Sequence, residues 1–241
     1  MKIAIVGYGR MGKLIERIAR ERGHQISCVI DHDNVADFDS PAFRSSDVAI
    51  DFSVPVTGYD NVVACLDRGI PVVSGTTGWQ QRLTEAEEHC RKVDGTMMWS
   101  SNFSLGVNLF FAINERVTSM LGNITAYTPY LTEVHHIHKL DHPSGTAVTL
   151  AEQIVEGTPR LDSWAEEPDK DGKCLVVNHV REGEVPGTHI IRWDSAVDAI
   201  TLRHDAKSRE GFALGAVMSA EWAASRKGVL NIRDFVDSLV K

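Results

Sequence analysis

The sequence has little cysteine, and what it has follows no recognisable pattern. Cys28, Cys65, Cys90 and Cys174 form neither a CxxC pair nor a short Cys/His zinc spacing. Three of them fall within apolar segments, so we expect buried free thiols rather than a disulfide framework. Free thiols fit a reducing compartment.

Long apolar runs and an excess of positive charge are also missing. No run of about eighteen apolar residues occurs, so we expect no membrane span. The formal net charge of -8 argues against a nucleic-acid partner, and an anionic substrate would need a local cationic pocket. Because Met1–Val6 already follows a strand pattern, we expect no signal or transit peptide and a cytoplasmic protein.

Strand and helix patterns alternate over the first part of the chain. Strands are predicted over 2–7, 25–31, 48–53, 71–75 and 97–101, and helices over 11–22, 61–68 and 83–93. This alternation implies parallel strands joined by right-handed crossovers. We therefore predict an α/β protein with a Rossmann-type doubly wound parallel sheet.

The alternation ends near residue 105. Helices are predicted over 105–121 and 146–155, a β-rich segment over 125–136, and several strands joined only by turns over 174–206. Strands that follow one another in this way form an antiparallel or mixed sheet, which predicts a second, α+β domain. Predicted helices over 212–225 and 231–240 would return to the first domain. The predicted domains are 1–104, completed by 211–241, and 105–210.

A glycine-rich loop follows the first predicted strand and opens the first helix. It reads Gly7-Tyr8-Gly9-Arg10-Met11-Gly12, a G-x-G-x-x-G motif in a strand–loop–helix context. The glycines allow a tight turn, a close approach of backbone to a pyrophosphate, and close packing of helix on strand. The helix N-terminus would bind the phosphates. This loop predicts a dinucleotide site.

Three other segments lie where a dinucleotide would extend. Asp31 ends the second strand and can accept hydrogen bonds from the adenosine ribose. The next residue is His32, which is not a fixed cation for a 2′-phosphate, so we expect NADH to be used at least as well as NADPH. Small and hydroxyl residues at two further strand ends suit the nicotinamide side of the cofactor: Gly75, Thr76, Thr77, Ser100, Ser101, Asn102 and Phe103.

The segment 133–147, EVHHIHKLDHPSGTA, contains four of the ten histidines. A metal site is one interpretation, but the helical spacing of zinc enzymes is missing, and we assign no metal. A solvated strand edge is another. The third is an anion-binding catalytic pocket in which Lys139 and the helix start at Gly145 and Thr146 bind carboxylates. A histidine would then supply the proton that accompanies hydride transfer.

At these positions the chain resembles the 4-hydroxy-tetrahydrodipicolinate reductase family, also called dihydrodipicolinate reductases. The residues that carry the resemblance are GYGRMG at 7–12, GTTG at 75–78, SNFSLGVN at 101–108, and 133–147, which matches E-x-H-H-x-x-K-x-D-x-P-S-G-T-A at every fixed position. The resemblance implies reduction of 4-hydroxy-tetrahydrodipicolinate to tetrahydrodipicolinate with NADH or NADPH, in lysine and diaminopimelate biosynthesis. It also implies a homotetramer assembled through the sheet of the second domain, which would bind substrate.

The resemblance further implies roles for single residues. His135 would be the proton donor, and Lys139 the second catalytic residue. His136, Ser144, Gly145 and Thr146 would contact the substrate carboxylates, and the cofactor would bind at 7–12, Asp31, 75–77 and 100–103. An aspartate- or homoserine-type dehydrogenase and a dinucleotide-binding module without chemistry stay open as alternatives. The dehydrogenase alternative does not account for the histidine cluster.

Overall fold

The computed structural model describes residues 1–240 and divides into two compact units. The first comprises Met1–Asn108 and the segment from Glu210 onward, and the second Leu109–Arg209. All four cysteines are free thiols. Within residues 1–240, no helix combines the length and the apolar character that crossing a membrane requires.

The first unit contains a six-stranded sheet with the order β11-β5-β4-β3-β1-β2, and the strand pairs are parallel. Its strands are β1 (Lys2–Val6), β2 (Gln25–Ile30), β3 (Val48–Asp51), β4 (Val72–Ser74), β5 (Thr96–Trp99) and β11 (Gly228–Leu230). Its helices are α1 (Arg10–Glu21), α2 (Pro41–Arg44), α3 (Pro55–Asp67), α4 (Leu83–Lys92), α7 (Glu210–Ala223) and α8 (Ile232–Leu239), with short 3-10 helices η1 (Val35–Asp39) and η2 (Gln80–Arg82).

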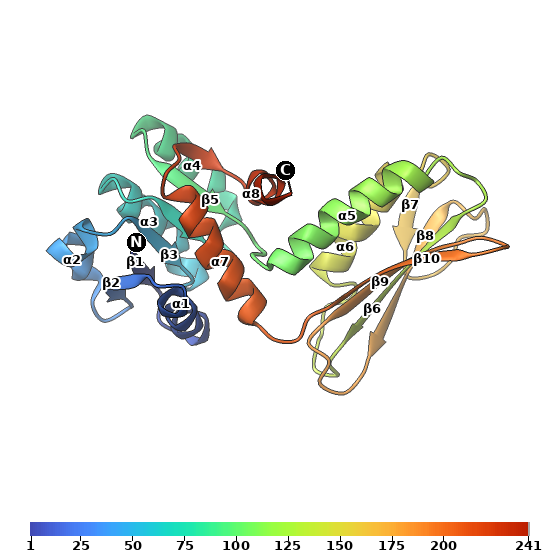
Figure 1. The fold of residues 1–241 in the computed structure, drawn as a ribbon, viewed down its shortest axis with the longest axis horizontal. Coiled ribbons are helices and arrows are strands. Elements are labelled where there is room, and N and C mark those ends of the chain that lie inside the picture. The colour runs from blue at the N-terminus through green and yellow to red at the C-terminus, as the bar shows by residue number, and fades with distance from the viewer. Residues whose placement is uncertain (241) are drawn as a thin grey trace. The chain divides into compact units, whose positions relative to one another are not determined.

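Helices cover both faces of this sheet (Figure 1), as the alternation of buried side chains requires. Ala4 and Val6 of β1 belong to a core cluster that includes Val62 of α3 and Ala86 of α4. Ile5, which points to the opposite face, lies beneath Gly12 of α1. Strands buried on both faces are typical of a doubly wound sheet, which confirms the predicted fold class.

The second unit contains a five-stranded mixed sheet with the order β10-β9-β6-β8-β7. Its elements are most of α5 (Leu105–Leu121), then β6 (Thr128–His135), α6 (Gly145–Glu156), β7 (Ser163–Ala165), β8 (Cys174–Arg181), β9 (Thr188–Asp194) and β10 (Ala199–Asp205). β9 pairs antiparallel with β6 and β10, whereas β8 pairs parallel with β6 and β7.

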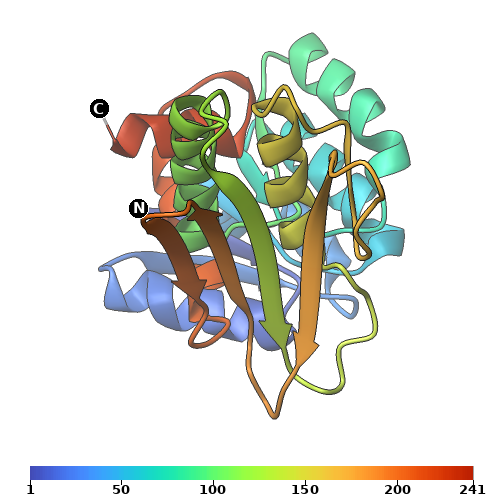
Figure 2. The ribbon, with the colours of Figure 1, turned by 90° about the vertical axis from the view of Figure 1, so that its right-hand side faces the viewer.

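The two faces of the second sheet differ. α5 and α6 lie against one face (Figure 2), where Leu131, Ile191 and Trp193 are fully buried in the core. Residues of β6 that point the other way, such as Thr128 and Tyr130, are exposed. The alternation along β6 therefore separates a core face from a face open to solvent.

The structure corrects several sequence-based element predictions. α3 begins at Pro55 rather than at residue 61. Proline is well suited to the first helical position, so the helix can start there. The next residue, Val56, is exposed. β7 and β11, each three residues long, and the short helix α2 were not predicted. β11 adds a sixth strand to the first sheet beside β5.

Candidate active site

The glycine-rich loop begins where β1 ends. Gly7 has a φ of 85°, and a Cβ there would lie 2.5 Å from the carbonyl oxygen of Phe52, which follows β3. A Cβ at Gly12 would lie 2.2 Å from the carbonyl oxygen of Gly7, so α1 packs closely on the loop. Gly9 is different. Leaving its chain neighbours aside, a Cβ at Gly9 would have no heavy atom of residues 1–240 within 4 Å. The second glycine therefore leaves open space where backbone can approach a ligand.

The start of α1 is also available to an anion. Gly9 occupies the N-cap position, and in the part of the chain that the structure describes no side chain caps the helix and no acidic residue lies in its first turn. The backbone N–H groups of this first turn carry a partial positive charge. The loop and the helix together have the properties of a phosphate-binding site.

A pocket of about 320 Å³ extends from this loop. It lies at the carboxyl ends of β1 and β3, the point where the strand order of the sheet reverses and where ligands bind in open α/β sheets. Asp31 lines it, and its carboxylate accepts a hydrogen bond from the His32 backbone N–H at 2.9 Å, which lowers the pKa of Asp31. The residues that line the pocket and that sequence analysis missed include Phe52, Ser53, Val54, Thr57 and Asn61.

The remaining predicted cofactor residues differ in how far their side chains are buried and in what they contact. Thr76 is buried and its hydroxyl donates to Asp51 at 2.8 Å, whereas Thr77 is exposed. A Cβ at Gly75 would overlap the Phe52 ring, so this glycine serves packing. The Phe103 side chain is buried against Phe52, with ring centroids 5.9 Å apart. Residues 75, 76 and 103 thus pack at the strand ends and are not among the residues that line the pocket.

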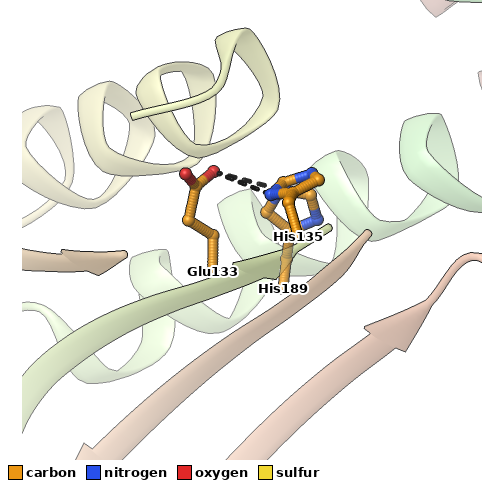
Figure 3. Close-up of side chains that lie close together, drawn as sticks. All are labelled: Glu133, His135 and His189. Carbon is orange, nitrogen blue, oxygen red and sulfur yellow. Dashed lines mark ion pairs between the residues drawn. The ribbon is translucent and has the colours of Figure 1, made fainter. Parts of the chain in front are cut away.

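In the second unit, three buried side chains gather on the core face of the sheet. Glu133 and His135 come from β6 and His189 from the neighbouring β9, and the Glu133 carboxylate points toward both imidazole rings (Figure 3). Its Oε2 atom lies 3.5 Å from His135 Nδ1 and 3.8 Å from His189 Nε2. The two rings meet edge to face, with centroids 5.3 Å apart.

Glu133 also holds two other segments. Its Oε2 accepts a hydrogen bond from the Ser144 backbone N–H at 3.0 Å, and its Oε1 lies 3.3 Å from Arg181 Nη2. Burial acts to raise the pKa of Glu133, but the hydrogen bonds from Ser144 and the charges of the histidines hold it below its usual value. A single buried carboxylate therefore connects β6, β8, β9 and the start of α6.

Burial shifts both histidines toward the neutral form. It lowers the pKa of His189 to about 4, with the neighbouring His135 acting in the same direction. Burial also lowers the pKa of His135, and the Glu133 carboxylate opposes this effect. Both rings are therefore neutral near pH 7.

The start of α6 lies beside this cluster. The Ser144 hydroxyl accepts a hydrogen bond from the Ala147 backbone N–H at 3.2 Å and lies 3.2 Å from His189 Nε2. Ser144 is thus the N-cap of α6 and is buried, while Gly145 is exposed. Within the described chain a Cβ at Gly145 would meet nothing within 4 Å other than its own helix and chain neighbours, so a ligand can reach the helix N-terminus there.

The loop between β6 and α6 carries the other predicted residues. Lys139 Nζ donates to both carboxylate oxygens of Asp141 at 2.8 Å, and Arg181 donates to the backbone carbonyl of Asp141 at 2.9 Å. His136 is half-buried, and among residues 1–240 its Nδ1 atom has no hydrogen-bond partner. The loop therefore presents a cation, a helix N-terminus and an unpaired ring nitrogen.

Comparisons with known proteins bear on this arrangement. Residues 1–103 match the family model "Dihydrodipicolinate reductase, N-terminus" and residues 106–236 match "Dihydrodipicolinate reductase, C-terminus". A 4-hydroxy-tetrahydrodipicolinate reductase of Christiangramia forsetii is 45% identical over 242 residues, which cover 100% of both chains. This chain belongs to the dihydrodipicolinate reductase family. The predicted family and the predicted oxidoreductase function are thereby confirmed.

Two further relatives extend the comparison. A 4-hydroxy-tetrahydrodipicolinate reductase of Magnetococcus marinus is 34% identical over 206 residues, which cover 80% of this chain and 74% of the relative. A solved dihydrodipicolinate reductase of Paenisporosarcina sp. TG-14, described as dipicolinate-bound, has a TM-score of 0.78 at 22% identity, covering 96% of this chain and 97% of that one. The latter likeness shows the shared fold. Members of the family are pyridine-nucleotide-dependent reductases.

Glu133, Arg181 and His189 are site residues that the sequence did not reveal. Glu133 stands within the matched signature, so its position in that pattern was the available signal. Arg181 and His189 lie at the end of β8 and the start of β9, and only strand pairing brings them beside Glu133. A pairing of strands so far apart along the chain leaves no local pattern in the sequence.

Proposed function

We propose that this chain reduces 4-hydroxy-tetrahydrodipicolinate to tetrahydrodipicolinate with NADH or NADPH, as a cytoplasmic step of lysine and diaminopimelate biosynthesis. The observation that supports it most directly is the buried Glu133–His135–His189 cluster beside Lys139 and the accessible start of α6. A proton donor, a cation and a helix N-terminus are what reduction of an unsaturated dicarboxylate requires.

The residues of the first unit fit a dinucleotide. We assign the cofactor to residues 1–104, completed by 211–241, and the substrate to residues 105–210. The open space at Gly9 and the uncapped start of α1 suit a pyrophosphate, and the pocket lined by Asp31 suits the adenosine ribose. When bound, the cofactor would supply the hydride; with one proton taken up and the 4-hydroxyl group lost as water, the conversion balances. The exposed Thr77 and Ser101 remain the nicotinamide-side candidates with free access.

The carboxylates of the substrate are bound by the loop between β6 and α6. One carboxylate pairs with Lys139, whose ammonium group Asp141 holds in place at 2.8 Å. The other accepts hydrogen bonds from the backbone N–H groups of Gly145 and Thr146 at the start of α6. His136, whose Nδ1 atom is unpaired among the described residues, contacts the same anion.

His135 delivers the proton. In the free protein Lys139 is paired with Asp141 and Arg181 with Glu133, so these charges cancel around a neutral His135. A doubly negative ring bound there favours the protonated imidazole, which can then act as a general acid. Glu133 is a positioning residue, because it approaches the His135 ring and the Ser144 N–H with one carboxylate oxygen.

The residues around the ribose pocket favour NADH. The Asp31 carboxylate is held in its charged form and would repel a 2′-phosphate. The His32 side chain is 89% exposed and is not a fixed cation that could compensate. We therefore expect kcat/KM for NADH to equal or exceed that for NADPH.

We also propose that the chain forms a homotetramer through the open face of the second sheet. Tyr130 on β6 and Val180 on β8 point to this face and are exposed, at 43% and 42%. Large apolar side chains on a sheet face free of helices suit burial against another copy of the same sheet.

A coupled assay tests the proposed reaction. Aspartate semialdehyde and pyruvate are first condensed by a separate synthase, and oxidation of NADH or NADPH is then followed at 340 nm after addition of this protein. We expect oxidation only with the fresh condensation product. Oxidation with aspartate semialdehyde alone would instead support a dehydrogenase of the aspartate or homoserine type, and cofactor binding without any turnover would support a binding module.

A further inference from the structure

Two histidines and a glutamate gather on the second unit outside the residues assigned to catalysis. His142 lies in the loop before α6, Glu166 directly follows β7, and His179 lies on β8. We propose that these three side chains form a binding site for a divalent transition-metal ion of the zinc type. The site would hold together three segments that are distant along the chain.

The spacing of the ligand atoms supports this proposal. Glu166 Oε2 lies 3.1 Å from His142 Nδ1 and 3.2 Å from His179 Nδ1. The three ligand atoms all lie within 4.8 Å of one another. In a tetrahedral zinc site with metal–ligand distances of about 2.0–2.1 Å, neighbouring ligand atoms are roughly 3.3 Å apart. Small side-chain rotations would therefore suffice to enclose an ion.

The two imidazoles also lie side by side, and rotation of the rings out of their stack would bring both nitrogen lone pairs onto one ion. The imidazoles of His142 and His179 are stacked, with centroids 4.4 Å apart and planes inclined by 17°. This arrangement directs both Nδ1 atoms to the same carboxylate. Two neutral imidazoles and one carboxylate are ligands that zinc, nickel and copper prefer over magnesium or calcium. The side chains are 33–50% exposed, so water can occupy a fourth position.

Other histidine–carboxylate groups in the described chain do not combine two imidazoles with a carboxylate that is available to a metal ion. His24 with Glu221, His89 with Asp67 and His138 with Glu184 each supply a single imidazole. The Glu133 cluster supplies two, but its carboxylate already accepts from Ser144 and pairs with Arg181. His142 also stands at a variable position of the family signature, so the proposed reaction does not account for it.

Isothermal titration of the full chain with ZnCl2 tests the proposal. We expect one high-affinity Zn2+ per chain. Removing a direct ligand in His179→Ala or Glu166→Gln should weaken binding by more than the roughly 10- to 100-fold that loss of an outer partner costs. His89→Ala, which disrupts the pair between His89 of α4 and Asp67 of α3, is the matched control and should bind as the unaltered chain does.

A second measurement guards against a folding defect. Zn2+ should raise the thermal midpoint of the unaltered chain and of His89→Ala, but not that of His179→Ala or Glu166→Gln. Circular dichroism establishes that each variant is folded, and Glu166→Gln preserves side-chain shape if His179→Ala does not fold. Unchanged zinc affinity in folded Glu166→Gln, or loss of binding only on substitution of His135 or a cysteine, would overturn the proposal.

Discussion

At the scale of single residues, the candidate active site depends on one buried carboxylate. Glu133 is fully buried, yet its charge is compensated by Arg181 and by the Ser144 backbone N–H. A buried charge is tolerated only with such partners. The same carboxylate raises the pKa of His135 against the effect of burial, so it favours the protonated form that proton delivery needs.

Replacing Glu133 with Gln tests this coupling. Without the negative charge, the pKa of His135 falls further, because burial then acts with less opposition. Proton delivery requires the protonated ring, so kcat/KM declines as pH rises through this pKa. The declining limb of the pH profile should therefore move to lower pH in Glu133→Gln. A purely structural role would reduce activity without moving that limb, which would contradict the proposed positioning role.

At the scale of elements, the glycine-rich loop assigns different tasks to its glycines. Gly12 allows α1 to pack on the carbonyl of Gly7, while Gly9 faces open space. The sequence motif predicts both tasks. The distances from an added Cβ to neighbouring atoms show that Gly12 is closely packed and Gly9 is not. Stability and cofactor binding should therefore respond to different substitutions within the same loop.

The variants Gly9→Ala and Gly12→Ala form a matched pair. A methyl group at Gly12 would overlap backbone and should lower the free energy of unfolding by about 1–3 kcal/mol. A methyl group at Gly9 meets no such obstacle in the described chain, so stability should be retained while KM for the cofactor rises roughly tenfold through lost pyrophosphate hydrogen bonds. Thermal melts and steady-state kinetics provide the readouts. Equal KM values in Gly9→Ala and the unaltered chain would argue against pyrophosphate binding there.

Long elements with clear apolar spacing were predictable from the sequence. The helix predicted over 105–121 matches α5, and strands β1 to β5 of the first sheet lie within a few residues of their predictions. Three-residue strands such as β7 and β11 were not predictable, because so short a segment has no periodicity. In the candidate site, His135 and Lys139 were identified by the family signature. Glu166 and His179 were not, because only folding brings them to His142.

At the scale of the whole molecule, the open face of the second sheet should determine assembly. Tyr130 lies on this face, away from the core side on which Glu133 and His135 lie. A charge on the face should oppose association of two copies without disturbing the buried cluster. A substitution on this face should therefore change the assembly of the chain without changing the structure of the candidate site.

Tyr130→Arg tests the assembly. We expect light scattering after size exclusion to give four chains for the unaltered protein and fewer for Tyr130→Arg, because an exposed cation would be buried against its own copy. Glu152→Arg, at an exposed position on α6, is a control that should leave the mass unchanged. A monomeric unaltered protein, or a Tyr130→Arg variant that keeps four chains, would exclude this face as the proposed interface.

In the proposed reaction, His135 delivers a proton to a ring whose carboxylates are bound by Lys139 and the start of α6. Steady-state kinetics of His135→Gln with the fresh condensation product test it most directly. We expect kcat to fall by about 10²- to 10⁴-fold while KM for the ring changes little, because the carboxylate-binding groups remain. An unchanged kcat, or a loss expressed only as a higher KM, would contradict it.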